Sequence, residues 1–290
     1  MTPARGGHLV LLHGFLGTPT EWLALRDQLP PALQARCHAL ALPGHLGGPV
    51  ATGFTGVNAW LDQTLLELGI QDCVLYGYSL GGRLALGYAR YSQARQVQQL
   101  HIAEAPGLAS PRALTAAPRY PRLHGLILEG ANPGLADSDL ITRQQRARQD
   151  ADWVHRLRRE PLPHVLDAWY RQAVFADLHD AQRHELVALR SRQPARQLAR
   201  MLAATSLARQ PDMLPWLQQG HLPVLYLYGS QDPRFAAVAG RLAACPHLQC
   251  ARIEGCGHNL HLLRADAIAR LLPGWLHTHL PPTLFPLSQD

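Results

Sequence analysis

Residues 73–81 read CVLYGYSLG, an apolar run that leads directly into a Gly-x-Ser-x-Gly sequence. The run at 73–76 is typical of a strand buried on both faces of a parallel sheet, and a helix is predicted to begin near Leu80. The glycines on either side of this turn permit a tight, strained corner, which lifts the Ser79 hydroxyl above the sheet. Ser79 is therefore the first candidate for a reactive group.

Strands and helices are predicted to alternate on both sides of this corner. Residues 18–29 are expected to form a helix, because Thr18 and Glu21 have the spacing of a capping box and proline occupies the first helical position. The remaining apolar and amphipathic segments predict strands at 8–12, 37–41, 223–228 and 249–253, and helices at 57–68, 235–244 and 265–275. This alternation indicates an α/β fold with a mostly parallel central sheet flanked by helices.

Residues 138–217 break the alternation, because they contain helical stretches such as 150–159 and 181–190 but no predicted strand. We expect an all-helical cap here, placed over the carboxyl edge of the sheet, where open α/β sheets bind their ligands. The predicted division is a core of residues 1–137 and 218–280, a cap of residues 138–217, and a loosely ordered tail of residues 281–290.

Two segments before the cap resemble each other. Residues 100–108 read LHIAEAPGL and residues 126–135 read LILEGANPGL, so each looks like a strand followed by glutamate and a Pro-Gly turn. The sequence does not decide which of the two segments lies in the sheet, or whether both do.

The 290-residue chain is 47% hydrophobic and 17% charged, a composition that builds a core and excludes general disorder. Its formal charge is +6, and all 27 basic residues are arginine, which excludes Schiff-base and phosphate-loop lysines. Twelve of these arginines lie at 143–200 beside seven acidic residues. Without a nucleic-acid-binding signature, this local excess favours a pocket for small anions over a nucleic-acid partner.

Five cysteines form an odd set without a Cys-x-x-Cys pair, which indicates buried thiols in a reducing compartment. No apolar run is long enough for a signal peptide or a membrane span. We therefore expect a cytoplasmic protein without membrane insertion. The sequence does not give the oligomeric state, and a monomer is favoured.

Two polar loops follow the last two predicted strands. The sequence GSQD at 229–232 ends in Asp232, and GCGH at 255–258 ends in His258. Both loops are expected at the sheet edge that carries Ser79, so the three side chains can form a nucleophile–base–acid triad. The order Ser, Asp, His along the chain is that of α/β-hydrolases.

An oxyanion hole requires backbone N–H donors near the serine. The amide of Leu80 follows Ser79 directly, and the loop after the first strand can bring the amide of Phe15 beside it. His13 in the same loop lacks the neighbours of a metal ligand, so no metal site is expected. His261 is interpreted as structural or substrate-lining.

The chain resembles the α/β-hydrolase family over nearly its whole length, through HGF at 13–15, LPGH at 42–45, GYSLG and the late Asp and His. A narrower resemblance is to the menaquinone (vitamin K2) biosynthesis enzymes that make 2-succinyl-6-hydroxy-2,4-cyclohexadiene-1-carboxylate. Its motifs are GYSLGGR at 77–83, EGANPGL at 129–135, WYRQAVFADL at 169–178, LVALRS at 186–191, ATSLARQPD at 204–212 and GHNLH at 257–261.

This resemblance implies a lyase that needs no cofactor. The family's substrate is a cyclohexene with a succinyl side chain and an enolpyruvyl ether, and pyruvate is eliminated from it. Ser79, activated by His258 and Asp232, would take a ring proton while the developing oxyanion is held by the Phe15 and Leu80 amides.

The resemblance also implies a set of substrate-binding residues for a small tricarboxylate. Matching motifs place them at Arg83, Arg146, Arg190, Tyr78 and Trp169, with Arg143 and Arg148 left open as alternatives to Arg146. Guanidinium groups suit such a substrate because they bind carboxylates bidentately. The competing hypotheses are a carboxylester or thioester hydrolase on the same scaffold, and an inactive binding protein that keeps the fold.

Overall fold

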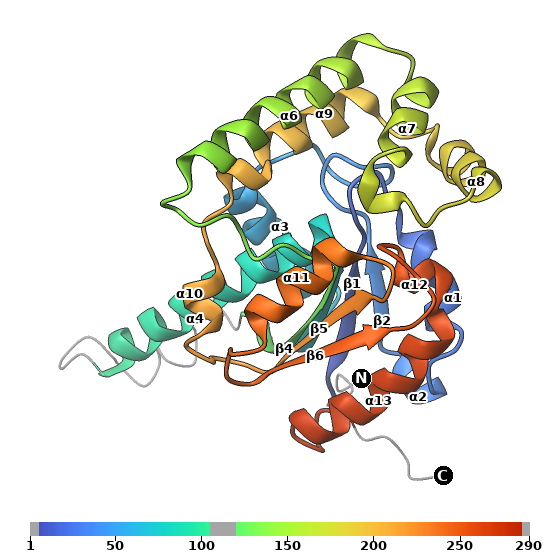
Figure 1. The fold of residues 1–290 in the computed structure, drawn as a ribbon. Helices are drawn as coiled ribbons and strands as arrows, with labels where there is room; N and C mark the ends of the chain where they lie inside the picture. Colours follow the sequence, from blue (N-terminus) through green and yellow to red (C-terminus); the bar gives the residue numbers. More distant parts are fainter. Residues whose placement is uncertain (1–5, 105–119, 286–290) are drawn as a thin grey trace.

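A computed structural model describes residues 6–104 and 120–285 of the chain. Its centre is a sheet of six parallel strands in the order β2-β1-β3-β4-β5-β6 (Figure 1). The strands are β1 (His8–Leu12), β2 (Cys37–Leu40), β3 (Asp72–Tyr78), β4 (Arg122–Glu129), β5 (Val224–Gly229) and β6 (Leu248–Ile253). The sheet confirms the predicted α/β class. Each strand except β4 coincides with an apolar run that the sequence predicted to be a strand, and β4 contains one of the two segments left open.

Helices cover both faces of the sheet. One face packs against α3 (Phe54–Glu67), α4 (Leu80–Glu104) and α11 (Pro233–Leu242). The other face packs against α1 (Leu23–Arg26), α12 (Leu260–Leu263) and α13 (Ala265–His279), and the short α2 (Pro31–Gln34) precedes β2. Because β1, β3, β4 and β5 are covered on both sides, their side chains are mostly buried, apart from the first three residues of β4.

Residues between β4 and β5 form helices only, and this segment is described throughout. They are α6 (Leu140–Arg159), α7 (Leu162–Tyr170), η2 (Ala173–Phe175), α8 (Asp180–Arg190), α9 (Ala195–Ala204), η3 (Leu207–Arg209) and α10 (Leu214–Leu217). Figure 1 shows α6, α7, α8 and α9 together over one end of the sheet. They have an apolar core of their own, which Leu16 joins from the loop after β1.

The ambiguity between the two similar segments is resolved in favour of the second. Residues 126–129 lie in β4, paired between β3 and β5, whereas residues 100–104 are the end of the long helix α4. Reading the first segment as a strand was wrong, because the helix that begins at Leu80 continues through it. Residues 105–108 of that segment lie outside the described residues.

The helix predicted at 18–29 is wrong in detail. Residues Pro19–Trp22 form a 3-10 turn, η1, and α1 ends at Arg26. The capping box is absent, because the Thr18 hydroxyl hydrogen-bonds that of Thr20 and the Glu21 carboxylate is engaged by a cap arginine instead. A tertiary ion pair therefore replaces the expected local contact.

The tail differs from expectation at its first residues. Leu284 and Phe285 are buried in the core beneath α13, and the Gly7 amide donates a hydrogen bond to the Leu284 carbonyl. Residues 286–290 of the expected tail lie outside the described residues. Among the described helices, none combines the length and the apolar character needed to cross a membrane.

Candidate active site

Ser79 occupies the sharp corner between β3 and α4. Its φ of 49° lies in the left-handed region, and its amide donates to the Glu129 carbonyl at 2.8 Å. Any Cβ at position 77 would lie 2.4 Å from the backbone of Gly81, so only glycine allows the strand and helix to approach this closely. Strain at a non-glycine residue is a feature of functional sites, and here it presents the serine hydroxyl at a helix start.

The structure brings His258 and Asp232 together at the same edge. The Nδ1 atom of His258 lies 3.3 Å from Oδ2 of Asp232, and both side chains are buried. The other carboxylate oxygen of Asp232 accepts from the Phe235 amide at 3.0 Å, which caps α11 and fixes the carboxylate. The Phe235 ring stacks on the His258 ring, with centroids 4.7 Å apart. The imidazole thus lies between a carboxylate and an aromatic face, although its Nδ1 makes no hydrogen bond with the residues that the structure describes.

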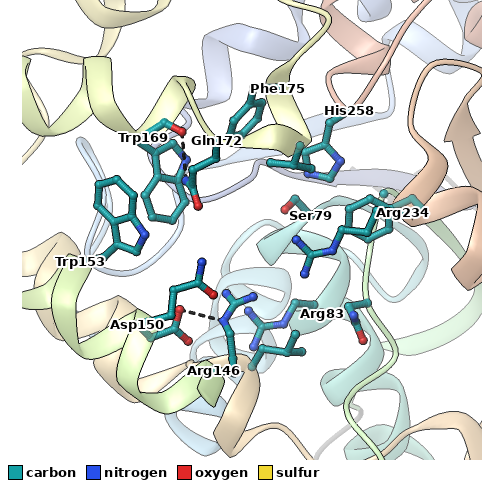
Figure 2. A pocket seen from close by; sticks show the side chains of 16 residues that line it. Ser79, Arg83, Arg146, Asp150, Trp153, Trp169, Gln172, Phe175, Arg234 and His258 are labelled. Carbon is teal, nitrogen blue, oxygen red and sulfur yellow. Dashed lines mark hydrogen bonds and ion pairs between the residues drawn. The ribbon is translucent and has the colours of Figure 1, made fainter. Parts of the chain in front are cut away.

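Ser79 and His258 both line one cavity between core and cap (Figure 2). The cap supplies aromatic walls, Trp153 from α6 and Trp169 from α7, whose rings are 4.9 Å apart. The loop that holds Phe15 is adjacent, since its ring lies 5.1 Å from that of Trp169. The cavity can therefore enclose a ligand against the serine and the imidazole.

Three guanidinium groups, of Arg83, Arg146 and Arg234, line this cavity. Arg146 pairs with Asp150, Nε to Oδ1, at 2.9 Å. Arg83 is buried and, among the described residues, bonds only neutral acceptors, the Gln210 side chain and the Thr205 carbonyl. Burial, with Arg146 nearby, lowers the pKa of Arg83 to about 9.

Arg234, at the start of α11, makes no hydrogen bond or ion pair with any other residue that the structure describes. Desolvation and the neighbouring Arg146 lower its pKa. Two of the three guanidinium groups in the cavity thus lack a carboxylate partner. A cavity with such uncompensated positive charge suits an anionic ligand.

The predicted binding residues divide into two groups. Arg83, Arg146 and Trp169 line the cavity, whereas Tyr78 and Arg190 do not. The buried Tyr78 hydroxyl donates to the Asn259 side chain, so this residue supports the loop of His258 instead. Arg190 is buried in an ion pair with Glu21, at 2.6 Å, which corrects the expectation that its guanidinium faces the ligand.

The open choice among three cap arginines is settled by their contacts. Arg143 donates to the backbone carbonyls of Leu135, Ala136, Ala208 and Gln210, a structural role beneath the cap. Arg148 is exposed and does not line the cavity, which Arg146 does.

Several cavity residues were missed by the sequence analysis. The most important is Arg234, and others are Asn132, Gln149, Asp150, Trp153, Gln172, Phe175 and Phe235. Arg234 could have been found, because it follows Asp232 by two residues at the start of a predicted helix. The others have no distinguishing local pattern, since their placement depends on how the cap sits.

Metal binding gains no support from the described residues, in which no group of three His, Cys, Asp or Glu side chains could hold an ion. His13 uses both ring nitrogens on the backbone, Nδ1 with the Gly14 carbonyl and Nε2 as acceptor from the Leu42 amide. Burial lowers its pKa to about 4, so the ring is neutral and holds two loops together.

A second set of ionisable groups is buried next to the site. His261 bonds the Glu129 carboxylate through Nδ1 at 2.8 Å, and its Nε2 lies 4.0 Å from Glu21. Although burial opposes charge, the two carboxylates raise the pKa of His261 to about 9. The Tyr78 ring lies 4.7 Å from the His261 ring, and His13 is close enough to interact with it electrostatically. Arg190 pairs with the same Glu21, and the Tyr76 hydroxyl donates to the same Glu129.

Comparison with known proteins shows which family the chain belongs to. The model of the Alpha/beta hydrolase family matches residues 9–271, so the chain belongs to the α/β-hydrolase family. Among curated proteins, the 2-succinyl-6-hydroxy-2,4-cyclohexadiene-1-carboxylate synthase of Klebsiella pneumoniae is 42% identical over 257 residues, 87% of each chain. That of Yersinia pseudotuberculosis is 38% identical over 286 residues, 96% of this chain and 91% of the relative. Within the α/β-hydrolases, the chain belongs to this synthase family.

Solved structures show the same fold. A structure of MenH from S. aureus has a TM-score of 0.75 at 23% identity, covering 95% of this chain and 94% of that one. A thermophilic esterase from Thermogutta terrifontis has a TM-score of 0.71 at 20% identity, covering 96% and 92%. Because both identities are low, these two likenesses concern the fold.

The raised pKa of His261 predicts a pH-dependent stability. Between pH 6.5, the ordinary pKa of histidine, and about 9, the folded protein holds a proton that the unfolded chain releases. Stability from this group is complete below pH 6.5 and is lost as the pH rises through 9. We expect the free energy of unfolding, measured in urea, to fall between pH 6.5 and 9.5.

The control is His261→Gln, because buried thiols such as Cys73, whose pKa burial raises to about 12, also destabilise the fold in alkali. The decline should be steeper in the wild type than in this variant. Equal slopes for the two proteins over this pH range would contradict a charged His261.

Proposed function

We propose that the chain is a carbon–oxygen lyase that eliminates pyruvate from 2-succinyl-5-enolpyruvyl-6-hydroxy-3-cyclohexene-1-carboxylate. The product would be 2-succinyl-6-hydroxy-2,4-cyclohexadiene-1-carboxylate, as the names of relatives at 38–42% identity indicate. The observation that carries the proposal is the cavity that joins Ser79 and His258 to three guanidinium groups.

Charge supports this substrate over a neutral one. The proposed substrate has three carboxylates, and planar guanidinium groups bind carboxylates through two parallel hydrogen bonds. Arg83 and Arg234 have no carboxylate partner in the described protein, so an anionic ligand would neutralise them. We assign binding of the substrate carboxylates to Arg83, Arg146 and Arg234. Trp169 would pack against the cyclohexene ring of the substrate.

In the proposed reaction, Ser79 removes the ring proton next to the succinyl ketone and passes it to His258, which Asp232 orients. The electron pair moves onto the ketone oxygen, where the amides of Phe15 and Leu80 would stabilise the charge. Collapse of this enolate shifts the ring double bond and breaks the carbon–oxygen bond. Enolpyruvate leaves and becomes pyruvate on protonation at carbon, so no acyl-enzyme forms and the ketone serves as the electron sink.

A cytoplasmic location and a monomeric state belong to the same proposal. All five cysteines are free thiols, which suits a reducing compartment.

Two assays in parallel test the function. The purified protein should release pyruvate from the enolpyruvyl substrate, detected by coupling to lactate dehydrogenase, and should cleave p-nitrophenyl acetate only slowly. Rapid ester cleavage without pyruvate release would show an ester hydrolase instead.

The control for this activity is Ser79→Ala, which should lower kcat by about 10⁴-fold or more, as removal of a triad member does. Ser92→Ala is the matched variant, because Ser92 is a buried serine of α4 outside the cavity, and it should leave kcat unchanged. Near-normal pyruvate release by Ser79→Ala would exclude Ser79 as the base.

Substrate recognition by Arg234 can be tested separately. Arg234→Gln should raise KM about 10- to 100-fold, because a charge-assisted hydrogen bond contributes about 1.5–3 kcal/mol. Arg241→Gln, an exposed arginine on the same helix, is the control and should leave KM unchanged. An unchanged KM in Arg234→Gln would remove this residue from the binding site.

A further inference from the structure

Four buried charged side chains form a continuous series from the cap into the core. They run from Arg190 to Glu21, then to His261 and finally to Glu129, and we call them the buried ionic chain. Arg190 Nε donates to Glu21 Oε1 at 2.8 Å, and His261 Nδ1 lies 2.8 Å from Glu129 Oε1. Their side chains are 0–2% exposed where they pair, so solvent does not screen these contacts.

At the inner end of this chain, Glu129 contacts both the Ser79 corner and the loop that carries His258. The Glu129 carbonyl accepts from the Ser79 amide at 2.8 Å, and its carboxylate accepts from the His261 amide at 3.1 Å. His261 follows His258 by three residues. Gly130, the next residue of this strand end, lies so close to the His258 ring that an added Cβ would be 2.7 Å from Cε1. A single residue, Glu129, therefore hydrogen-bonds both the Ser79 corner and the loop that follows His258.

The outer end of the chain seats the cap. Arg190 is the last residue of α8, and it also donates to the hydroxyl of Tyr170 on α7. Three residues later, the side-chain amide of Gln193 donates to the carbonyls of Leu16 and Gly17 at 3.1 and 2.8 Å. These carbonyls belong to the loop that follows Phe15. The cap thus docks on the loop expected to supply an oxyanion donor.

Burial makes the loss of any one of these ionic contacts costly. Cations and carboxylates alternate along the chain, and removing one member leaves its neighbour as an uncompensated buried charge. Glu21 Oε2 and His261 Nε2 have no hydrogen-bond partner among the described residues and face each other at 4.0 Å. The contact between Glu21 and His261, which both belong to the core, is therefore ionic without a hydrogen bond, and it depends on Arg190 of the cap holding Glu21 in place.

We propose that Arg190 and Glu21 are positioning residues that act through His261 and Glu129 to align Ser79 with His258, and that Arg190 does not bind substrate. The assay of this role by turnover rests on the proposed lyase activity. A direct contact with a substrate carboxylate is the competing explanation for an arginine at this place in the cap.

A double-mutant cycle separates the two explanations. We expect Arg190→Gln and Glu21→Gln each to lower kcat for pyruvate release by about tenfold, with KM changed less than threefold. The double variant should be no slower than the slower single variant, because both substitutions break the same link. Arg183→Gln is the matched control: Arg183 lies on the same helix and pairs with Asp167 and Asp180, away from the buried ionic chain, and kcat should stay unchanged.

The reactivity of Ser79 towards a fluorophosphonate gives a readout that does not depend on the substrate. The single variants should be labelled about tenfold more slowly than the wild type, and the double variant no more slowly than the slower single variant. If the wild type releases no pyruvate but shows this pattern of labelling, the proposed function fails and the positioning role stands.

Three results would overturn the positioning role. They are a KM raised tenfold or more in Arg190→Gln with kcat unchanged, wild-type kcat and labelling in Glu21→Gln, or multiplicative losses in the double variant. Folding is checked by circular dichroism. If Arg190→Gln does not fold, Arg190→Lys replaces it, because lysine keeps the positive charge but lacks the planar guanidinium group with its several N–H donors. A slower labelling rate at unchanged KM is then expected, and a raised KM with normal labelling would contradict the proposal.

Discussion

Uncompensated guanidinium charge in the cavity that Ser79 and His258 line is the constraint on which this site depends. Arg83 is buried against neutral acceptors, and Arg234 lacks a partner within the described protein. The charge of Arg83 is withdrawn from water and requires a counter-charge, whereas Arg234 is exposed to solvent. Asp150 is the one carboxylate among the described residues that line the cavity, and Arg146 already engages it. An anionic ligand meets this need, and its carboxylates would hold the reacting carbon near Ser79. The same ion pairs would thus bind the ligand and place its reacting carbon at Ser79.

Core and cap contribute differently to this arrangement. The parallel sheet brings Ser79, Asp232 and His258 to one edge, because each follows the carboxyl end of a strand. The cap adds aromatic walls and Arg146, and it docks through the buried pair of Arg190 and Glu21. Residues that contact a ligand and residues that hold the cap therefore come from the same helical segment. Their sequence motifs alone do not distinguish the two roles.

This difference explains how far the sequence could predict the structure. The sheet, most of its helices and the loops that hold Ser79, Asp232 and His258 were predictable, because apolar periodicity and glycine-rich corners act over a few residues. The strand order, the continuation of α4 through 100–104 and the burial of Leu284 depend on distant contacts. Arg190 was misassigned for the same reason, since its partner Glu21 is 169 residues away and looked like part of a capping box.

The most direct measurement is a crystal structure of the protein with pyruvate bound. The account predicts a pyruvate carboxylate within hydrogen-bonding distance of Arg83, Arg146 or Arg234, beside the Ser79 hydroxyl, while Arg190 remains paired with Glu21. A pyruvate bound outside this cavity, or held by Arg190 after its separation from Glu21, would contradict it.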